Sequence, residues 1–570
     1  MSGPEGAQDD SALLAAARAW LAQDPDGQTR DELRSLIART EDADAAARAD
    51  LASRFSERLA FGTAGLRGAL GAGPNRMNRV LVTQAAAGLA AFLIERAGDG
   101  AAPSVVVGYD GRRNSDVFAR DSAEIFAGAG LRAILLPRML PTPVLAYAVR
   151  RLGASAGVMV TASHNPPDDN GYKVYLGGDD AGSQIVAPAD AAIAAHIHRV
   201  AEGDIGDLPR SVGYEKAAEP VIDEYVAATA AVAPAPPGAA GLRWVYTAMH
   251  GVGWETLARI VEAAGYPEPS PVEAQLHPDS AFPTVAFPNP EEPGALDLAF
   301  ETARAVDAEL IIANDPDADR LAVAIPDPGA EGGWRMLSGN EVGLLLGWRA
   351  ARAAATRTAE GTDAAASLAC SLVSSPGLEA IAAHYGLGFH ATLTGFKWIS
   401  RAPGIVYGYE EALGYLVNPD TVRDKDGISA AIAVLGMVGE ARDRGETLAD
   451  VLAEFRDTFG AFASDQISLR VEQVSEIAAI MAALRAEPPT RVGEAEVARV
   501  DDLAHGFEGL PPGDVLRYHL ADGSRLIVRP SGTEPKLKLY LDVRAATEKK
   551  ARKRLAELDA GARGLLDAVL

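Results

Sequence analysis

Apolar positions follow a helical period at the start of the chain. Leu13, Leu14, Ala17, Trp20 and Leu21 fall on one face of a helix, and helical composition continues to about residue 55. This pattern predicts an N-terminal helical extension over residues 1–55.

From about residue 61 the period changes, and short apolar runs rich in β-branched residues alternate with helical patterns. The runs fall at residues 104–108, 131–136 and 157–161, and residues 116–129 have helical periodicity. Apolar runs separated by helices predict a parallel or mixed sheet with helices on its faces. The alternation resumes after a Pro/Gly/Ala-rich segment, residues 233–241, and continues to about residue 462. The main fold class predicted is therefore α/β.

The last hundred residues have a different pattern. Residues 536–543 alternate strictly between polar and apolar, residues 515–520 and 525–529 resemble further strands, and Asp522-Gly523 predicts a hairpin between these two. A helix is expected from Thr547, which makes this an α+β domain with an antiparallel sheet. With roughly 150 residues per domain, 570 residues suggest about four domains. The expected boundaries are 1–55 for the extension and 56–232, 241–333, 334–462 and 463–570 for the domains.

Composition narrows the functional classes. Lys and Arg number 53 against 78 Asp and Glu, a net charge of −25, which argues against a nucleic-acid partner and requires a locally basic site for any anionic substrate. The single cysteine, Cys370, excludes an intramolecular disulfide and a cysteine-built metal site. Apolar stretches such as residues 80–94 fall short of the roughly 20 residues that span a bilayer. The first ten residues lack the apolar core of a signal peptide. We therefore expect a cytoplasmic protein without a membrane partner.

The loop at residues 161–173, TASHNPPDDNGYK, is the most informative segment. The predicted strand at residues 157–161 leads into a polar loop that holds Ser163 and His164. Pro166 and Pro167 each fix φ and stiffen this loop, and the next strand projects Lys173. A hydroxyl fixed at a strand end is a suitable nucleophile, although any one of these residues alone would fit an ordinary polar loop. The surrounding residues do not form G-x-S-x-G, which argues against a hydrolase elbow.

A second loop, NDPDADR at residues 314–320, carries three carboxylates at alternate positions. An extended backbone places Asp315, Asp317 and Asp319 on one side, where they repel one another unless a cation lies among them. Hard oxygen ligands select Mg²⁺, Mn²⁺ or Ca²⁺. An EF-hand is excluded because Arg320 and Pro326 occupy the positions that require Gly and Glu. The alternative is an acidic surface turn, but the strand placement and strict alternation favour a metal site.

Two further loops suggest recognition of a phosphorylated sugar. RPSGTEPK, residues 529–536, offers guanidinium, hydroxyl, amide and ammonium donors. A plain hairpin connection is the alternative, but these donors favour a phosphate-binding loop. The donors are Arg529, Ser531, Gly532, Thr533 and Lys536. In YGYEEALG, Glu410 and Glu411 are suited to sugar hydroxyls or could be surface acids. Residues 63–68 and 394–397 are weaker candidates that could be plain turns.

In their order and spacing these loops resemble the α-D-phosphohexomutase family. The segments FGTAGLRG and VRDKDG, at residues 61–68 and 422–427, further resemble its phosphoglucomutase/phosphopentomutase branch. The resemblance implies three related α/β/α domains with mixed sheets and a C-terminal α+β domain, similar to TATA-binding protein, around a central cleft.

The resemblance also implies roles for individual residues. Ser163 would carry a phosphoryl group, and the three aspartates would hold Mg²⁺ together with an oxygen of that phosphoserine. Glu410 would bind sugar hydroxyls, and the 529–536 loop would bind the distant phosphate. Arg67, Lys173, Arg320, Thr394 and Lys425 match positions that contact the bisphosphorylated sugar or assist proton transfer. Lys173 is the first candidate for the general base, with Lys425 and His164 as alternatives.

The activity implied is interconversion of glucose 1-phosphate and glucose 6-phosphate through glucose 1,6-bisphosphate, by a monomer or homodimer whose partner is a small phosphosugar. Ala412 stands where many relatives have Ser, a pattern similar to phosphopentomutases and glucose-1,6-bisphosphate synthases. Phosphopentomutase, phosphomannomutase and bisphosphate synthase activities are therefore alternatives. A non-catalytic phosphosugar-binding protein is a fourth, against which the intact Ser163 and the three aspartates argue.

Overall fold

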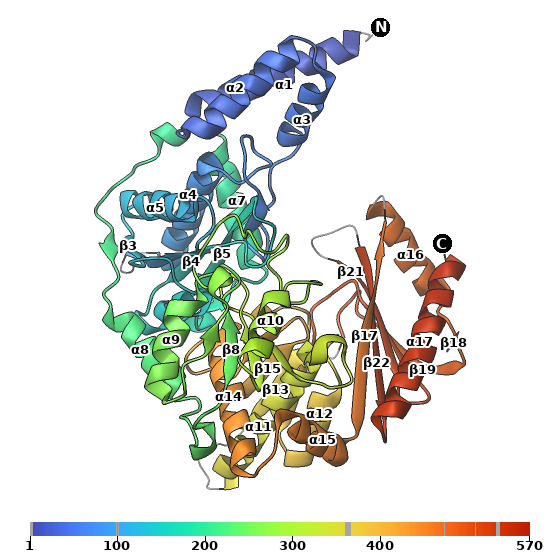
Figure 1. Cartoon of the computed structure of the whole chain (residues 1–570). Coiled ribbons are helices and arrows are strands. Elements are labelled where there is room, and N and C mark those ends of the chain that lie inside the picture. Colours follow the sequence, from blue (N-terminus) through green and yellow to red (C-terminus); the bar gives the residue numbers. More distant parts are fainter. Residues whose placement is uncertain are drawn as a thin grey trace. The chain divides into compact units, whose positions relative to one another are not determined.

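The computed structural model describes residues 4–98, 100, 102–359, 366–471, 474–507, 509–531 and 536–569. The chain divides into two compact units. Figure 1 shows the ribbon coloured along the sequence. The first unit comprises Met1–Ala235, Ala239–Arg335 and Asn418–Gly436. The second comprises Pro236–Gly238, Met336–Val417 and Met437–Leu570. The segment Asn418–Gly436 thus lies in the first unit, although its neighbours in sequence lie in the second.

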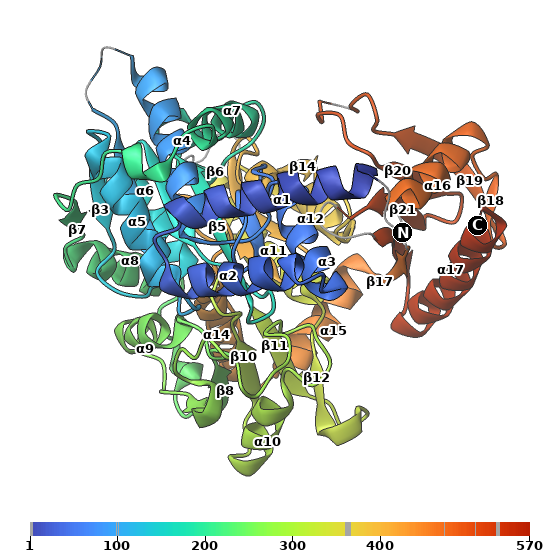
Figure 2. The same ribbon diagram turned by 90° about the horizontal axis from the view of Figure 1, so that it is seen from above.

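Three helices lie side by side at the start of the first unit (Figure 2): α1 (Pro4–Gln23), α2 (Gly27–Glu41) and α3 (Ala45–Phe55). Their apolar faces pack around Trp20, and Leu33 and Leu51 are fully buried. The helices predicted over this stretch are therefore present, and burial of their apolar stripe is what stabilises them.

A mixed sheet forms the centre of the next region. Its strands are ordered β1-β5-β4-β2-β3-β7, with β6 paired to β5. They are β1 (Leu66–Ala69), β2 (Ser104–Tyr109), β3 (Arg132–Leu135), β4 (Ala156–Val160), β5 (Asp169–Leu176), β6 (Ser183–Gln184) and β7 (Glu215–Lys216). Pairs β2–β3 and β2–β4 are parallel, whereas β4–β5 is antiparallel. The predicted α/β arrangement is confirmed.

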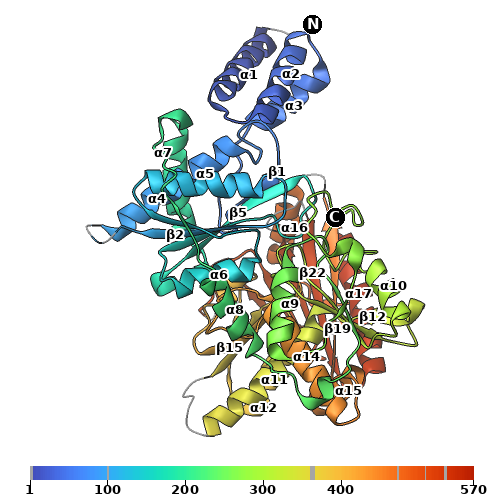
Figure 3. The same ribbon diagram turned by 60° about the vertical axis from the view of Figure 1, so that its left-hand side comes forward.

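Helices cover this sheet on opposite faces, as α5 and α6 show in Figure 3. They are α4 (Arg79–Ala97), α5 (Ser115–Gly128), α6 (Thr142–Arg151) and α7 (Ala189–Ala201), followed by α8 (Pro220–Ala230). Among the described helices, only α4 is long and apolar enough to cross a membrane. Because 61% of its apolar window is buried inside the fold, α4 has the character of a core helix.

The second sheet has the order β12-β11-β10-β8-β9 and completes the first unit. Its strands are β8 (Trp244–Thr247), β9 (Ser270–Pro271), β10 (Leu310–Ala313), β11 (Ala322–Pro326) and β12 (Trp334–Met336), accompanied by α9 (Gly253–Ala264) and α10 (Asp297–Ala305). Strand β10 is parallel to β8 and antiparallel to β11.

The second unit holds the other two sheets. One is ordered β14-β13-β15-β16 and contains β13 (Ser367–Ser371), β14 (Gly388–Thr392), β15 (Ile405–Glu410) and β16 (Gly414–Leu416). Its helices include α11 (Gly339–Ala359), α12 (Gly377–Tyr385), α13 (Phe396–Ile399) and α15 (Leu448–Phe459); α14 (Gly427–Asp443) begins in the first unit. Only its last pair, β15–β16, is antiparallel.

The fourth sheet is antiparallel throughout and has the order β17-β22-β21-β20-β19-β18. The strands are β17 (Ala461–Arg470), β18 (Arg491–Val492), β19 (Ala495–Asp502), β20 (Leu516–Leu520), β21 (Arg525–Pro530) and β22 (Lys536–Ala545). Helices α16 (Val474–Ala486) and α17 (Glu548–Val569) pack on one face (Figure 1). The predicted α+β domain and its hairpin are confirmed, with Gly523 at φ 84° in the turn.

The three mixed sheets share one feature that positions the candidate loops. In each, the loop joins a strand that has a parallel neighbour to an antiparallel strand that follows: β4 to β5, β10 to β11, and β15 to β16. Antiparallel strands can be joined by a short connection, whereas parallel strands require a crossover. The candidate side chains therefore lie on or beside connections whose two ends are both anchored in a sheet.

Candidate active site

Ser163 lies on the loop between β4 and β5 in a constrained position. Its side chain is buried, and its φ of 53° is in the left-handed region, which costs free energy for a residue other than Gly. Ser163 Oγ donates to Asp315 Oδ2 at 2.8 Å and lies 3.1 Å from His164 Nδ1. The structure thus brings the predicted nucleophile to the predicted metal loop.

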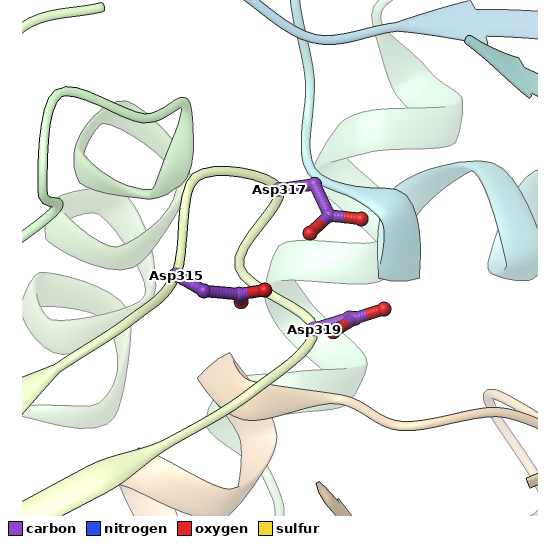
Figure 4. A group of neighbouring side chains, drawn as sticks. All are labelled: Asp315, Asp317 and Asp319. Atoms are coloured by element: carbon purple, nitrogen blue, oxygen red, sulfur yellow. The ribbon is translucent and has the colours of Figure 1, made fainter. Parts of the chain in front are cut away.

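Asp315, Asp317 and Asp319 converge on the loop between β10 and β11 (Figure 4). All three are fully buried, and one carboxylate oxygen from each lies within 4.8 Å of the other two. Asp317 Oδ2 accepts hydrogen bonds from Thr142 Oγ1 at 2.6 Å and Lys173 Nζ at 2.7 Å.

The donor set fits a divalent cation. Asp317 Oδ1 and Asp319 Oδ1 are buried oxygens with no hydrogen-bond partner among the described residues. Burial, with the charges of Asp317 and Asp319, raises the pKa of Asp315 to about 8. A hard cation such as Mg²⁺ would occupy these oxygens and offset the repulsion between the carboxylates.

Two lysines from different parts of the first unit contact the aspartates. Lys173, on β5, places Nζ 2.9 Å from Asp319 Oδ2, and Lys425 Nζ lies 3.2 Å from the same oxygen. Lys425 comes from the segment Asn418–Gly436, where Asp424 Oδ2 accepts hydrogen bonds from Tyr175 Oη at 2.8 Å and Gln184 Nε2 at 2.9 Å. Those contacts fix the segment beside the cluster.

The candidate proton-transfer groups differ in charge. Burial alone would lower the pKa of Lys173, but the carboxylates of Asp317 and Asp319 outweigh burial and raise the pKa above its usual value. Burial, together with the charges of Arg320 and Arg67, lowers the pKa of His164 well below 6.5. Near neutral pH, Lys173 is therefore an ammonium and His164 is a neutral imidazole, although its lowered pKa makes it a weak base.

Two arginines complete the first group. Arg67, on β1, donates from Nη1 to Asn165 Oδ1 at 3.1 Å. The backbone N–H of Arg320 donates to Asp315 Oδ1 at 3.0 Å, and its guanidinium lies 3.8 Å from the Glu291 carboxylate. All the predicted residues of the first unit therefore lie around one buried centre.

The second unit brings together the other predicted residues that the structure describes. Glu410 ends β15 and is 8% exposed. Its neighbour Glu411 is held through Ser374, whose Oγ donates to Glu411 Oε2 at 2.8 Å. Arg529 Nη1 donates to Thr394 Oγ1 at 2.8 Å, which joins the fourth sheet to the loop after β14.

The loop that follows Arg529 is described at both ends. The backbone N–H of Ser531 donates to the carbonyl of Lys536 at 2.7 Å, which closes the base of the loop. Gly532 and Thr533 lie outside the described residues. Ser531 and Lys536 therefore stand at the neck of a loop that starts at Arg529.

Three residues near the centres were not singled out from the sequence. Thr142 bonds Asp317, and Arg112 bonds the loop of Ser163. Tyr540, on β22, lies near Glu411, Arg529 and Glu410; burial is the main cause of its raised pKa. A signal existed for Arg112, because it follows β2 at the carboxyl edge of a parallel pair, where α/β proteins collect functional side chains.

Comparison with known proteins finds four domain matches between residues 58 and 560. Residues 58–204, 223–329 and 338–459 match the α/β/α domains I, II and III of phosphoglucomutase/phosphomannomutase, and residues 467–560 match the C-terminal domain. A probable phosphomannomutase of Haemophilus influenzae is 55% identical over 86% of this chain and 98% of its own. A probable phosphoribomutase of Schizosaccharomyces pombe is 34% identical over 94% of each chain. A phosphoglucomutase of Staphylococcus epidermidis is 34% identical over 85% of this chain and 90% of its own.

The four domain matches follow one another in order, and each contains one of the four candidate loops. The similar proteins have names that refer to three different sugars, so the matches establish the class of enzyme and leave the sugar open. On these grounds the chain belongs to the phosphoglucomutase/phosphomannomutase family, the α-D-phosphohexomutases, whose members are phosphosugar mutases.

Proposed function

We propose that this mutase is Mg²⁺-dependent and carries the transferred phosphoryl group on Ser163. The observation that supports this most directly is the position of the Ser163 hydroxyl, 2.8 Å from Asp315 Oδ2. The same buried cluster has two carboxylate oxygens, Oδ1 of Asp317 and of Asp319, without a hydrogen-bond partner among the described residues. A nucleophile next to an oxygen-rich cation site is the arrangement that phosphoryl transfer requires.

In the proposed reaction, phosphorylated Ser163 transfers its phosphoryl group to the free hydroxyl of a sugar monophosphate. The sugar oxygen forms a bond to phosphorus as the bond from phosphorus to Ser163 Oγ breaks. The sugar hydroxyl loses its proton to a base, for which His164 is the candidate that is already neutral, and Ser163 Oγ regains a proton, which the Lys173 ammonium would supply. The resulting bisphosphate turns over and returns its other phosphate to Ser163.

Asp315, Asp317 and Asp319, with an oxygen of the phosphoserine, would hold the cation. When bound, Mg²⁺ supplies neutralisation of the charge on the transferring group. Lys425, Arg67 and Arg320 add fixed positive charge on this side and would stabilise the equatorial oxygens.

Recognition of the remainder of the substrate is assigned to the second unit. Glu410 would accept hydrogen bonds from sugar hydroxyls. Arg529, Thr394 and the neck residues Ser531 and Lys536 would bind the non-reacting phosphate, with Gly532 and Thr533 completing the loop. Because either phosphate of the bisphosphate must occupy this place in turn, the loop should recognise charge more than sugar geometry.

The proposed sugar is glucose, with interconversion of its 1- and 6-phosphates through glucose 1,6-bisphosphate, in the cytoplasm. Pentose phosphates are the second candidate, because Ala412 removes a hydroxyl beside Glu410 and a relative matching along most of its length is named a phosphoribomutase.

A coupled assay with glucose, mannose, ribose and deoxyribose 1-phosphates tests both proposals. We expect the highest kcat/KM with glucose 1-phosphate, together with a gain of about 80 Da on Ser163 in intact-mass spectra. A higher kcat/KM with ribose 1-phosphate would change the proposed substrate and leave the proposed mechanism unaffected. An absence of phosphoserine during turnover would refute the mechanism.

A further inference from the structure

Arg112 is buried beneath the loop that carries Ser163. It is 4% exposed, and its guanidinium donates to four main-chain carbonyls of that loop. Nη2 lies 2.6 Å from the carbonyl of Ser163 and 2.5 Å from that of Asn165, and Nη1 lies 2.8 Å from that of Pro166 and 3.1 Å from that of Asp169. The donors of a guanidinium have fixed directions in one plane, so all four bonds form only when the loop has one shape.

Arg112 is itself held from two sides. Its backbone N–H donates to Asp110 Oδ1 at 3.0 Å, Nε lies 3.7 Å from Asp110 Oδ2, and Ser115 Oγ fixes the same carboxylate at 2.7 Å. The ring of Phe282, from the long connection between β9 and α10, lies 5.0 Å from the guanidinium carbon. Carboxylate and ring together leave Arg112 little freedom to move.

The conformation of Ser163 needs such support. A φ of 53° is unfavourable for Ser, and residues persist in such conformations only where their surroundings over-determine them. One of the four carbonyls that Arg112 binds belongs to Ser163 itself. The four hydrogen bonds from Arg112, which we call the clamp, therefore act on the residue whose hydroxyl must remain next to Asp315.

We propose that Arg112 is a positioning residue for phosphoryl transfer. It fixes the main chain of residues 163–169 and so aims Ser163 Oγ at the metal loop. The inference rests on the proposed role of Ser163 as the phosphoryl carrier. Because a misplacement of about 1 Å can cost roughly 100-fold in rate, loss of the clamp should slow transfer with little effect on sugar-phosphate binding.

The test compares Arg112→Lys with Arg113→Lys. Lys keeps the charge but offers three donors on one atom, which cannot reach four carbonyls. In single-turnover experiments with phosphorylated enzyme, we expect transfer to the sugar phosphate to be about 100-fold slower in Arg112→Lys, with KM within about threefold of the wild-type value. Arg113 is adjacent and 53% exposed, and it faces the exposed Asp168, so Arg113→Lys should transfer at the wild-type rate.

A single-turnover rate constant reports only on phosphorylated, folded molecules, so a loss of folded protein does not imitate the effect. If Arg112→Lys does not fold, the second variant is Arg112→Gln, whose two N–H donors on one atom cannot bond all four carbonyls, and it should slow transfer by a similar factor. Wild-type transfer rates in whichever variant folds would overturn the inference. Ser163→Ala separates the two proposals: turnover in that variant refutes the carrier itself, whereas an inactive Ser163→Ala beside a fully active Arg112→Lys refutes only the clamp.

Discussion

The centre around Ser163 and the loops around Arg529 are built in different ways. In the first unit, the three aspartates are fully buried, Lys173 is 6% exposed, and contacts from β5, α6 and the segment Asn418–Gly436 fix the aspartates. In the second unit, Arg529, Ser531 and Thr394 are half-buried, and the hydrogen bond between Arg529 and Thr394 joins the fourth sheet to the loop after β14.

This difference fits the proposed division between bond-making in the first unit and phosphate binding in the second. Bond-making requires fixed charges in a site of low dielectric, where electrostatic stabilisation is strongest. Binding a phosphate that arrives in two orientations requires donors that water can also reach. Changes in the first unit should therefore lower kcat, and changes in the second unit should raise KM.

The largest effect should come from Ser163→Ala. It removes the proposed carrier and leaves the phosphate-binding residues of the second unit in place, so turnover should fall by roughly 10⁴–10⁶-fold while sugar phosphate still binds. Steady-state kinetics and a binding titration measure the two quantities. Turnover near the wild-type rate would remove Ser163 from the mechanism.

Removal of the metal should come next. Chelation with EDTA should abolish activity, and added Mg²⁺ should restore it. Asp317→Asn removes the charge of one ligand. Loss of an outer-shell partner typically weakens metal binding roughly 10–100-fold, so loss of a ligand charge should weaken Mg²⁺ binding by at least that factor. The matched control is Asp168→Asn. The side chain of Asp168, on the loop of Ser163, is 82% exposed, so this variant should bind Mg²⁺ as the wild type does. Full activity in excess chelator would refute a catalytic metal.

Arg529→Ala should weaken the forward and reverse reactions alike, chiefly through KM. A charge-assisted hydrogen bond contributes roughly 1.5–3 kcal/mol, or about 10–150-fold in affinity. Ser163 should still become phosphorylated, because that centre lies in the other unit. Arg552→Ala, on the exposed face of α17, serves as the control. If only one direction suffers, this loop does not hold both orientations of the bisphosphate.

The smallest effect should come from Thr394→Val, which removes the acceptor for Arg529 and nearly conserves volume. Loss of one hydrogen bond of roughly 0.5–1.5 kcal/mol should raise KM for sugar phosphate by about 2–12-fold at unchanged kcat. A fall in kcat without a change in KM would contradict the proposed division between the two units.

Much of this molecule could be predicted from local sequence patterns. The apolar period predicted the strands beside the Ser163 and Arg529 loops, and the alternation of Asp315, Asp317 and Asp319 predicted a converging carboxylate cluster that the structure contains. These features depend on residues a few positions apart, and the backbone geometry of a strand or turn decides where their side chains lie. The resemblance to phosphohexomutases supplied the family, which the domain matches confirm.

Only the tertiary structure decided which distant segments meet. Nothing local places Lys425 beside Asp319, Thr142 against Asp317, or Arg112 beneath Ser163. From the sequence, Lys173 is the first candidate for the general base. In the structure, the carboxylates of Asp317 and Asp319 raise the pKa of Lys173, whereas burial and nearby cations lower the pKa of His164. A pKa is set by the charges and solvent around a group, and here residues far apart in the chain supply them.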